Sequence, residues 1–267
     1  MNGSVQKHSL PAQMAEHAES SRQEARRRRQ TPTRAHDERA SWLAQAPGRT
    51  NDPERTRSNI LEVALAEFAE RGFDGARIDE IAAATATSKR MIYYYFGSKE
   101  GLYQAVLEEA YREMRASEAA LDLDRYEPVE ALRRLVGFTF DHHHEHEPYI
   151  RLVMNENIQR GRHLARSERI RGMNVPAIEA VERLYRRGVE AGVFRPGLEP
   201  IDLHASISAL CFFNTSNRHT FGQIFGYDFF SPPVYARRRA AVIELIERYV
   251  RALTPSESAA ASPNPGA

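Results

Sequence analysis

Apolar side chains follow a helical period over most of the chain. From about residue 54 to residue 253 they recur three and four residues apart, as Ile60, Ala64 and Phe68 do, and no segment alternates with period two. Residues 1–50 and 254–267 have no sustained apolar period and are rich in small and polar residues, so we expect both segments to be disordered. The sequence therefore predicts an all-α protein between two disordered tails.

Residues 78–103 carry the most informative pattern, a short helix, a tight turn, a second short helix and the start of a third. Ile78, Ile81 and Ala82 give the first helix one apolar face. The period then breaks, and Ser88 is a good N-cap for the second helix because its hydroxyl can accept a hydrogen bond from a free amide of the first turn. The pattern predicts two short helices joined by a small turn.

The second short helix has a mixed surface. Ile92 and Phe96 recur four residues apart as its buried face, Gly97 ends it, and Ser98 caps the next helix. The residues left facing outward are basic or large, namely Lys89, Arg90, Met91, Tyr93 and Tyr94. This arrangement is typical of a helix-turn-helix that reads DNA with its second helix.

The stretch resembles the tetracycline-repressor (TetR) family of bacterial transcriptional regulators. The residues that carry the resemblance are Ile81-Ala82, Ser88-Lys89, Tyr93-Tyr94-Tyr95-Phe96, Ser98-Lys99-Glu100 and Leu102. The sequence departs from the family at Arg77, usually a small hydroxylated residue, at Ala86, usually glycine, and at Tyr94, often histidine. A left-handed backbone at position 86 would therefore be mildly strained.

By this resemblance, residues 54–114 form a three-helix DNA-binding domain with the helix-turn-helix at about 77–96, and residues 115–253 form a helical domain for effector binding and dimerisation. The first turn of the second short helix suits contacts with base edges in the major groove. The resemblance gives phosphate contacts to Ser88, Tyr93, Tyr94 and Lys99. The full predicted DNA-binding set is Arg57, Arg77, Ser88, Lys89, Arg90, Met91, Tyr93, Tyr94 and Lys99.

Charge and cysteine content narrow the class of protein. The formal net charge is only +1, but residues 1–50 hold nine Lys or Arg against five Asp or Glu, and residues 51–100 hold seven against nine. The run Arg26–Arg29 is either a solvated tail or a basic arm that attracts phosphates. A single cysteine, Cys211, fits a reducing compartment, and no apolar run approaches the roughly 18 residues of a membrane span. We expect a cytoplasmic, nucleoid-associated bacterial protein.

Residues 141–147, Asp-His-His-His-Glu-His-Glu, invite a metal interpretation. On a helix, His142 and His146 are one turn apart and could share an ion. The alternative is a solvated helix end before Pro148, which we favour because the order of residues does not match the helical zinc-hydrolase motif.

Polar side chains also lie among apolar ones further along the chain, where they must be satisfied by a ligand, by a partner helix or by water. A ligand is one interpretation and a structural role is the other. The residues predicted on the first interpretation are Met154, Asn157, His204, Ser208, Cys211, Phe212 and Asn214.

The last helix, about residues 232–253, is apolar on more than one side, which is unusual for a monomer of this size. With the apolar segment 201–213 and two symmetry mates it would form a four-helix dimer interface, the arrangement usual in the family resembled. The predicted interface residues are Val242, Ile243, Ile246, Tyr249 and Val250.

These patterns favour a ligand-responsive regulator, most often a repressor in the family resembled, which binds a palindromic DNA operator as a homodimer and is released by an unknown small molecule. We expect no cofactor and no catalytic activity, because no nucleophile motif, phosphate-binding glycine loop or carboxylate pair is present. The alternatives are a metal-dependent helical hydrolase using His142 and His146, and a helical adaptor that acts through protein contacts only and would show no salt-sensitive affinity for DNA.

Overall fold

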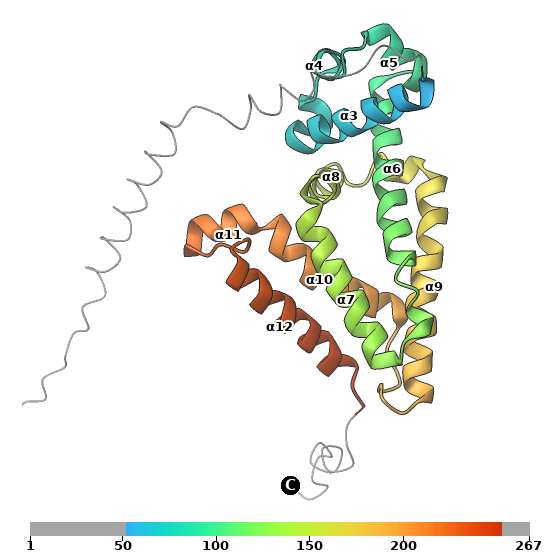
Figure 1. Cartoon of the computed structure of the whole chain (residues 1–267), viewed down its shortest axis with the longest axis vertical. Coiled ribbons are helices and arrows are strands. Elements are labelled where there is room, and N and C mark those ends of the chain that lie inside the picture. Colours follow the sequence, from blue (N-terminus) through green and yellow to red (C-terminus); the bar gives the residue numbers. More distant parts are fainter. Residues whose placement is uncertain (1–51, 253–267) are drawn as a thin grey trace, which may run out of the picture. The chain divides into compact units, whose positions relative to one another are not determined.

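The computed structural model describes residues 52–252, and within that range it contains ten α-helices and no β-strand, so the all-α prediction is confirmed (Figure 1). A lone antiparallel bridge joins Phe194 to Arg251. The predicted tails, including Arg26–Arg29, lie outside the described residues. The helices are α3 (Pro53–Gly75), α4 (Ile78–Ala84), α5 (Lys89–Phe96), α6 (Lys99–Ala119), α7 (Pro128–Glu145), α8 (Glu147–Ile158), α9 (Glu168–Glu190), α10 (Pro200–Ser216), α11 (Arg218–Phe225) and α12 (Pro232–Val250).

Local signals place α4, α5 and the start of α6 as predicted. The Ser88 hydroxyl accepts from the Met91 amide at 3.3 Å and caps α5, and Ser98 accepts from the Gly101 amide at 3.0 Å and caps α6. Gly97 ends α5 with a φ of 76°, a conformation that glycine adopts without strain. The ends of these helices are therefore set by short-range hydrogen bonds that can be predicted from the sequence.

The helices enclose two apolar cores. The first joins α3, α4, α5 and the first part of α6, and it also takes in Leu152 of α8 and Ile170 of α9. The second joins α7, the second part of α9, α10 and α12. We call the predicted DNA-binding domain, residues 54–114, the reading domain. Leu152 of α8 and Ile170 of α9 pack into its core, so the packing boundary does not follow the predicted division of the chain at residues 114 and 115.

Helix α8 attaches the reading domain through polar contacts to the end of α3. Arg151 Nε donates to the Ala69 carbonyl at 2.8 Å, and Asn155 Nδ2 donates to the Phe68 carbonyl at 3.2 Å. Next to them lies a fully buried pair, in which Glu156 Oε1 is 2.7 Å from His163 Nδ1. The His163 ring also contacts the ring of Tyr103 on α6, with centroids 4.7 Å apart. These contacts make the reading domain, α8 and the loop after it one packed body.

Three segments differ from the sequence prediction. Residues 162–173 are polar and rich in arginine, which predicts a loop or short helix, but they contain the start of α9, which Ser167 caps by accepting from the Ile170 amide at 3.1 Å. The sequence also predicts a helix start at Pro176, which lies inside α9 instead. Residues 222–231 hold two glycines and four aromatic residues, which predicts a loop, but they include the end of α11.

Candidate nucleic-acid interface and ligand cavity

Helix α5 presents its predicted reading face to solvent. Ile92 is fully buried and anchors the helix, while Arg90 is exposed and Tyr94 keeps 78% of its surface accessible. Met91 and Tyr93 are also exposed. Arg and Lys can donate to guanine O6 and N7, and a methionine can contact a thymine methyl group, so this face has the chemistry of a major-groove reader.

Lys89 is the one base-reading candidate with an internal partner among the described residues. Its ammonium forms an ion pair with Asp79 of α4, and both side chains are about half exposed. Exposed ion pairs of this kind contribute about 0–1 kcal/mol, so a phosphate or a base edge could take the place of Asp79. Lys89 remains available to DNA at little cost.

The remaining predicted cations are Arg57 on α3, Arg77 before α4 and Lys99 at the start of α6. The Arg57 guanidinium lies 5.5 Å from the centroid of the Phe96 ring, at the end of α5. Lys99 Nζ donates to the Asp74 carbonyl at 3.4 Å and lies 5.0 Å from the centroid of Phe73. Arg77 is exposed directly before α4. Six of the nine predicted residues thus lie on α5 or at its N-cap, and Arg57 contacts Phe96 of the same helix. The contacts of all nine with DNA stay a prediction.

The turn between α4 and α5 contains Ala86, where the family resembled usually has glycine. Ala86 has a φ of 50°, in the left-handed region that disfavours residues with a Cβ atom. Two backbone hydrogen bonds hold the turn, from the Ala86 amide to Ala83 O at 3.2 Å and from the Thr87 amide to Ala82 O at 3.0 Å. The turn therefore keeps the geometry that glycine would adopt more easily.

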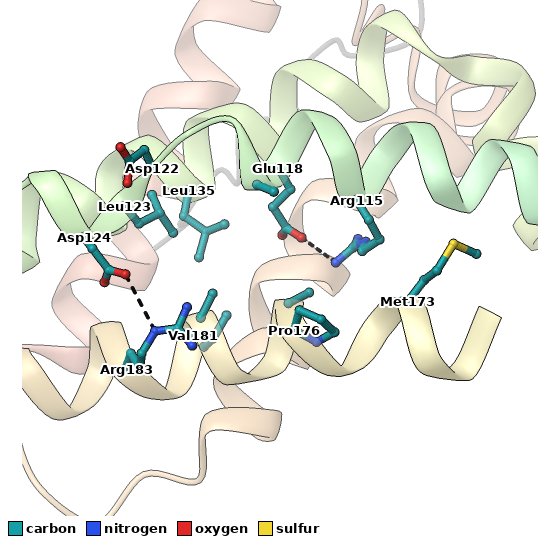
Figure 2. A pocket seen from close by; sticks show the side chains of 13 residues that line it. Arg115, Glu118, Asp122, Leu123, Asp124, Leu135, Met173, Pro176, Val181 and Arg183 are labelled. Atoms are coloured by element: carbon teal, nitrogen blue, oxygen red, sulfur yellow. Dashed lines mark hydrogen bonds and ion pairs between the residues drawn. The ribbon is translucent and has the colours of Figure 1, made fainter. Parts of the chain in front are cut away.

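A cavity of about 220 Å³ lies between the end of α6, α7 and the middle of α9 (Figure 2). It is placed where the two cores meet, because Met173 packs against the first core whereas Leu123, Leu135 and Val181 belong to the second. Pro176, Ala177 and Ala180 of α9 complete the apolar part of its wall. An occupant here would contact both packed bodies at once.

One ion pair is nearly buried in this cavity. Arg115 and Glu118 project from α6 into the space facing α9, and Arg115 Nη1 is 2.5 Å from Glu118 Oε2 (Figure 2). Their side chains are only 13% and 10% exposed. Burial raises the pKa of Glu118 despite the adjacent guanidinium. Arg115 Nε has no hydrogen-bond partner within the described part of the chain, although buried polar atoms normally have one.

His142 and His143 of α7 are buried, so the solvated helix end that we favoured is wrong for these two residues, whereas Glu145 and His146 are exposed. His142 and His143 are 6% and 5% exposed, because α8 and α10 cover this end of α7, as their ring contacts with Tyr149 and Phe212 show. Burial lowers the pKa of His142 to about 4 and that of His143 to about 3, with a neighbouring histidine and Arg115 adding to the effect. Both rings are therefore neutral near pH 7.

The geometry of the histidines does not form a metal site. The rings of His142 and His146 are stacked, with centroids 4.0 Å apart and planes at 12°, so their in-plane lone pairs do not converge. His146 Nδ1 is instead 3.0 Å from the His142 carbonyl. Among residues 52–252 no group of three or more His, Cys, Asp or Glu side chains could hold a metal ion.

The predicted effector residues do not line this cavity. Asn214 is buried but satisfied, because it donates to the Leu210 carbonyl at 2.7 Å and accepts from Arg238 Nε at 3.0 Å. Cys211 is buried in the second core, and Asn157 is exposed and donates to the carbonyl of Val153. The other predicted members, Met154, His204, Ser208 and Phe212, are half-buried on α8 and α10. Asn214 and Asn157 thus have hydrogen-bond partners within the chain, and a role of the seven residues in effector binding stays a prediction. Arg115, the polar group at the cavity, was not among them.

The predicted dimer residues divide between the inside and the outside of the chain. Val242, Ile246 and Val250 are fully buried in the second core, so assigning them to a surface between two chains was wrong. They lie four residues apart on the face of α12 that packs against α7. Ile243 is half-buried, and Tyr249 is 41% exposed. On the outer side of α12, Leu245 is 50% exposed.

No helix within residues 52–252 has both the length and the apolar character that crossing a bilayer requires.

Comparisons with known proteins match both halves of the described structure. Residues 60–106 match the family of bacterial regulatory proteins called tetR, and residues 128–246 match the tetracyclin repressor-like C-terminal domain. The HTH-type transcriptional repressor NicS of Pseudomonas putida is 37% identical over 180 residues, which are 67% of this chain and 85% of that protein.

Two proteins of Streptomyces coelicolor are also similar. The HTH-type transcriptional repressor SCO4008 is 35% identical over 158 residues, 57% of this chain and 74% of that protein. The crystal structure of the transcriptional regulator SCO4942 superposes with a TM-score of 0.55 at 27% identity, covering 74% of this chain and 99% of that one.

Proposed function

Because the chain belongs to the TetR family of DNA-binding transcriptional regulators, a non-enzymatic family, we propose that it is a repressor released from its operator when a small molecule occupies the cavity between α6, α7 and α9. Curated relatives are named repressors, which supports the direction of regulation. The observation that carries the effector site is the position of this cavity at the meeting of the two cores.

Helix α6 supplies the mechanical link. Its first turn follows the reading helix directly, after Gly97 and the Ser98 cap, and its last turns carry Arg115 and Glu118 into the cavity. With 21 residues at about 1.5 Å each it spans about 30 Å. A change at the cavity is therefore transmitted to the reading helix without an intervening flexible segment.

A second contact ties the start of α9 to α6. Ser167 Oγ donates to Glu108 Oε1 at 2.9 Å, and Arg169 Nη1 lies 3.4 Å from Glu108 Oε2. Pro176 divides this first part of α9 from the remainder, because proline cannot donate the helical hydrogen bond at that point. An occupant of the cavity would thus displace α6 and the start of α9 together.

The proposed operator complex is a symmetric dimer, with two copies of α5 in successive major grooves about 34 Å apart. Arg90, Lys89 and Met91 would read base edges, and Ser88, Tyr93, Tyr94 and Lys99 would contact phosphates. The outer faces of α10 and α12 are proposed as the dimer surface, since their large apolar side chains Phe213, Leu245 and Tyr249 stay exposed in one chain.

A cavity-filling substitution tests this function without knowledge of the effector. Ala177→Phe would fill the cavity and mimic an occupant, whereas Ala116→Phe adds the same group to the exposed side of α6. Binding is measured by fluorescence anisotropy on an operator fragment selected from random duplexes. We expect Ala177→Phe to change operator affinity and Ala116→Phe to leave it as in the wild type. Equal effects of the two substitutions would refute the cavity as the control point.

A further inference from the structure

We propose that the effector of this cavity is a small organic carboxylate, which accepts hydrogen bonds from Arg115 and displaces Glu118 from the guanidinium. The inference rests on the proposed function in one respect, since it takes the cavity at the meeting of the two cores as the effector site. It adds the chemical class of the ligand.

The first argument is the incomplete satisfaction of Arg115. A guanidinium has five N–H donors, and the carboxylate of Glu118 is bonded through Nη1 alone. Nε has no partner among the described residues. It is one of the donors through which arginine binds a carboxylate in bidentate fashion. The guanidinium thus carries a buried donor without a partner, and a ligand with an anionic oxygen that reached it from the cavity would complete its hydrogen bonding.

The second argument is the weak hold on Glu118. Burial raises the pKa of this carboxyl even though it contacts Arg115, so desolvation outweighs the attraction of the ion pair. The Glu118 carboxyl can therefore leave the ion pair with Arg115, either by rotating toward the solvent or by taking up a proton. Exchange of one carboxylate for another on the same guanidinium then leaves no buried charge without a partner.

The third argument concerns the other acidic groups at the cavity, which would repel an anion if they were unpaired. Asp124 lies 3.7 Å from Arg183 Nε and 3.3 Å from Arg187 Nη1, and Asp122 lies 2.5 Å from Arg125 Nε. Each therefore has an arginine partner that compensates its charge, and Figure 2 shows the pair of Asp124 and Arg183. No comparable unpaired acid faces the cavity to favour a cationic ligand.

Size and shape limit the ligand further. The volume of about 220 Å³ corresponds to roughly seven water molecules at about 30 Å³ each, which suits an acid of about ten non-hydrogen atoms. Leu135, Met173, Pro176 and Val181 offer the body of such a molecule an apolar surface, and the flexible thioether of Met173 can adapt to it. The complementary ligand is an acid with a compact apolar body.

The test measures ligand binding to the full chain by calorimetry, without DNA. The probes are acetate, benzoate and phenylacetate, each beside its neutral amide. We expect at least one acid to bind the wild type roughly tenfold more tightly than its amide, as a hydrogen bond to a charged group predicts. A wild type that binds no acid in preference to its amide would overturn the inference.

Variants of the ion pair give the sharper result. Glu118→Gln removes the competitor for Arg115, so the preferred acid should bind several-fold more tightly. Equal or weaker binding of the acid would contradict the displacement of Glu118. The double variant Arg115→Gln with Glu118→Gln keeps a neutral amide pair in the cavity and should bind acid and amide alike. Arg112→Gln breaks an exposed pair on the same helix and is the control that should change nothing.

Operator binding separates this inference from the proposed function. If acids bind with the expected dependence on Arg115 but do not release the selected operator fragment, the ligand class stands and the regulatory function fails. If no acid binds while Ala177→Phe still changes operator affinity, the cavity remains the control point and the carboxylate is wrong.

Discussion

Replacing Ala86 by glycine should stabilise the protein. Ala86 has a φ of 50°, where the Cβ atom of an L-residue costs about 1–2 kcal/mol relative to the right-handed region. The side chain is exposed, so its methyl group contributes no core packing that glycine would lose. Against this, glycine destabilises the folded state by about 0.5–1 kcal/mol, because its unfolded chain has more conformational freedom to lose. The net expectation is a gain of about 0.5–1 kcal/mol.

The matched control is Ala83→Gly, three residues earlier in α4. Ala83 is also exposed but lies in a regular helix, where glycine costs about 0.5–1 kcal/mol and relieves no strain. The same chemical change should therefore have opposite signs at two neighbouring positions. For a chain of this size, about 1 kcal/mol shifts the melting temperature by roughly 2–4 °C.

The measurement is thermal unfolding followed by circular dichroism, with operator affinity recorded in parallel. Because the backbone hydrogen bonds of the turn do not involve the methyl group, Ala86→Gly should leave the reading helix in place and operator affinity unchanged. A lower melting temperature for Ala86→Gly, equal to that of Ala83→Gly, would show that the turn is not strained and refute the reasoning.

Three further expectations follow from the described contacts. Arg90→Ala should alter which sequences are selected, at about 1–3 kcal/mol on the preferred site, whereas Lys99→Ala should weaken all duplexes alike and reduce the salt slope by about one in a titration series. Leu245→Glu should give a folded monomer by light scattering, but Ile246→Glu should unfold the chain because position 246 is buried. The pKa of His143 is lowered to about 3, so the unfolded chain takes up its proton first and stability falls as pH drops below about 6.5. Between pH 7 and 5 this loss is about 2 kcal/mol, and urea unfolding of His143→Gln should show a correspondingly flatter pH dependence.

The elements that the sequence predicts well are those set by local chemistry. Ser88, Gly97 and Ser98 mark helix ends through hydrogen bonds and backbone angles that involve only three or four neighbouring residues. Pro128 and Pro232 likewise stand at the first position of α7 and α12. A single sequence contains all the information that these boundaries need.

Burial of a particular helix face depends on distant partners, and here the sequence was ambiguous. His142 and His143 precede a proline and adjoin charged residues, which is typical of a solvated helix end, yet α8 and α10 cover them. The apolar positions of α12 spread over two sides, and only the packing against α7 shows that Val242 and Ile246 face inward while Leu245 faces outward. The sequence signal for the buried side was the four-residue spacing of Val242, Ile246 and Val250. These residues form a narrower and more regular stripe than the other apolar residues of α12.

Position 176 shows how one rule can mislead. A proline is favoured in the first turn of a helix, so the sequence predicts a helix start at Pro176. The serine at position 167 is an equally good cap, and its hydroxyl also donates to Glu108 of α6. Helix α9 begins at Glu168, more than two turns before the proline. The cavity opens beside Pro176, so the misplaced boundary also hid the candidate effector site.

The energetics of release are consistent with a ligand of the proposed class. To move an operator-binding dimer from about 1% to about 99% released, ligands must favour the released state by about 5.5 kcal/mol in total. Two cavities in the proposed dimer share this requirement, which leaves about 2.7 kcal/mol for each. A hydrogen bond to a charged group contributes about 1.5–3 kcal/mol, so one or two bonds to Arg115 that form only in the released state would suffice. The bonds must differ between the two states, because a ligand bound equally well by both shifts nothing. Arg115 meets this condition if the movement of α6 relative to α9 decides whether Glu118 or the ligand holds its guanidinium.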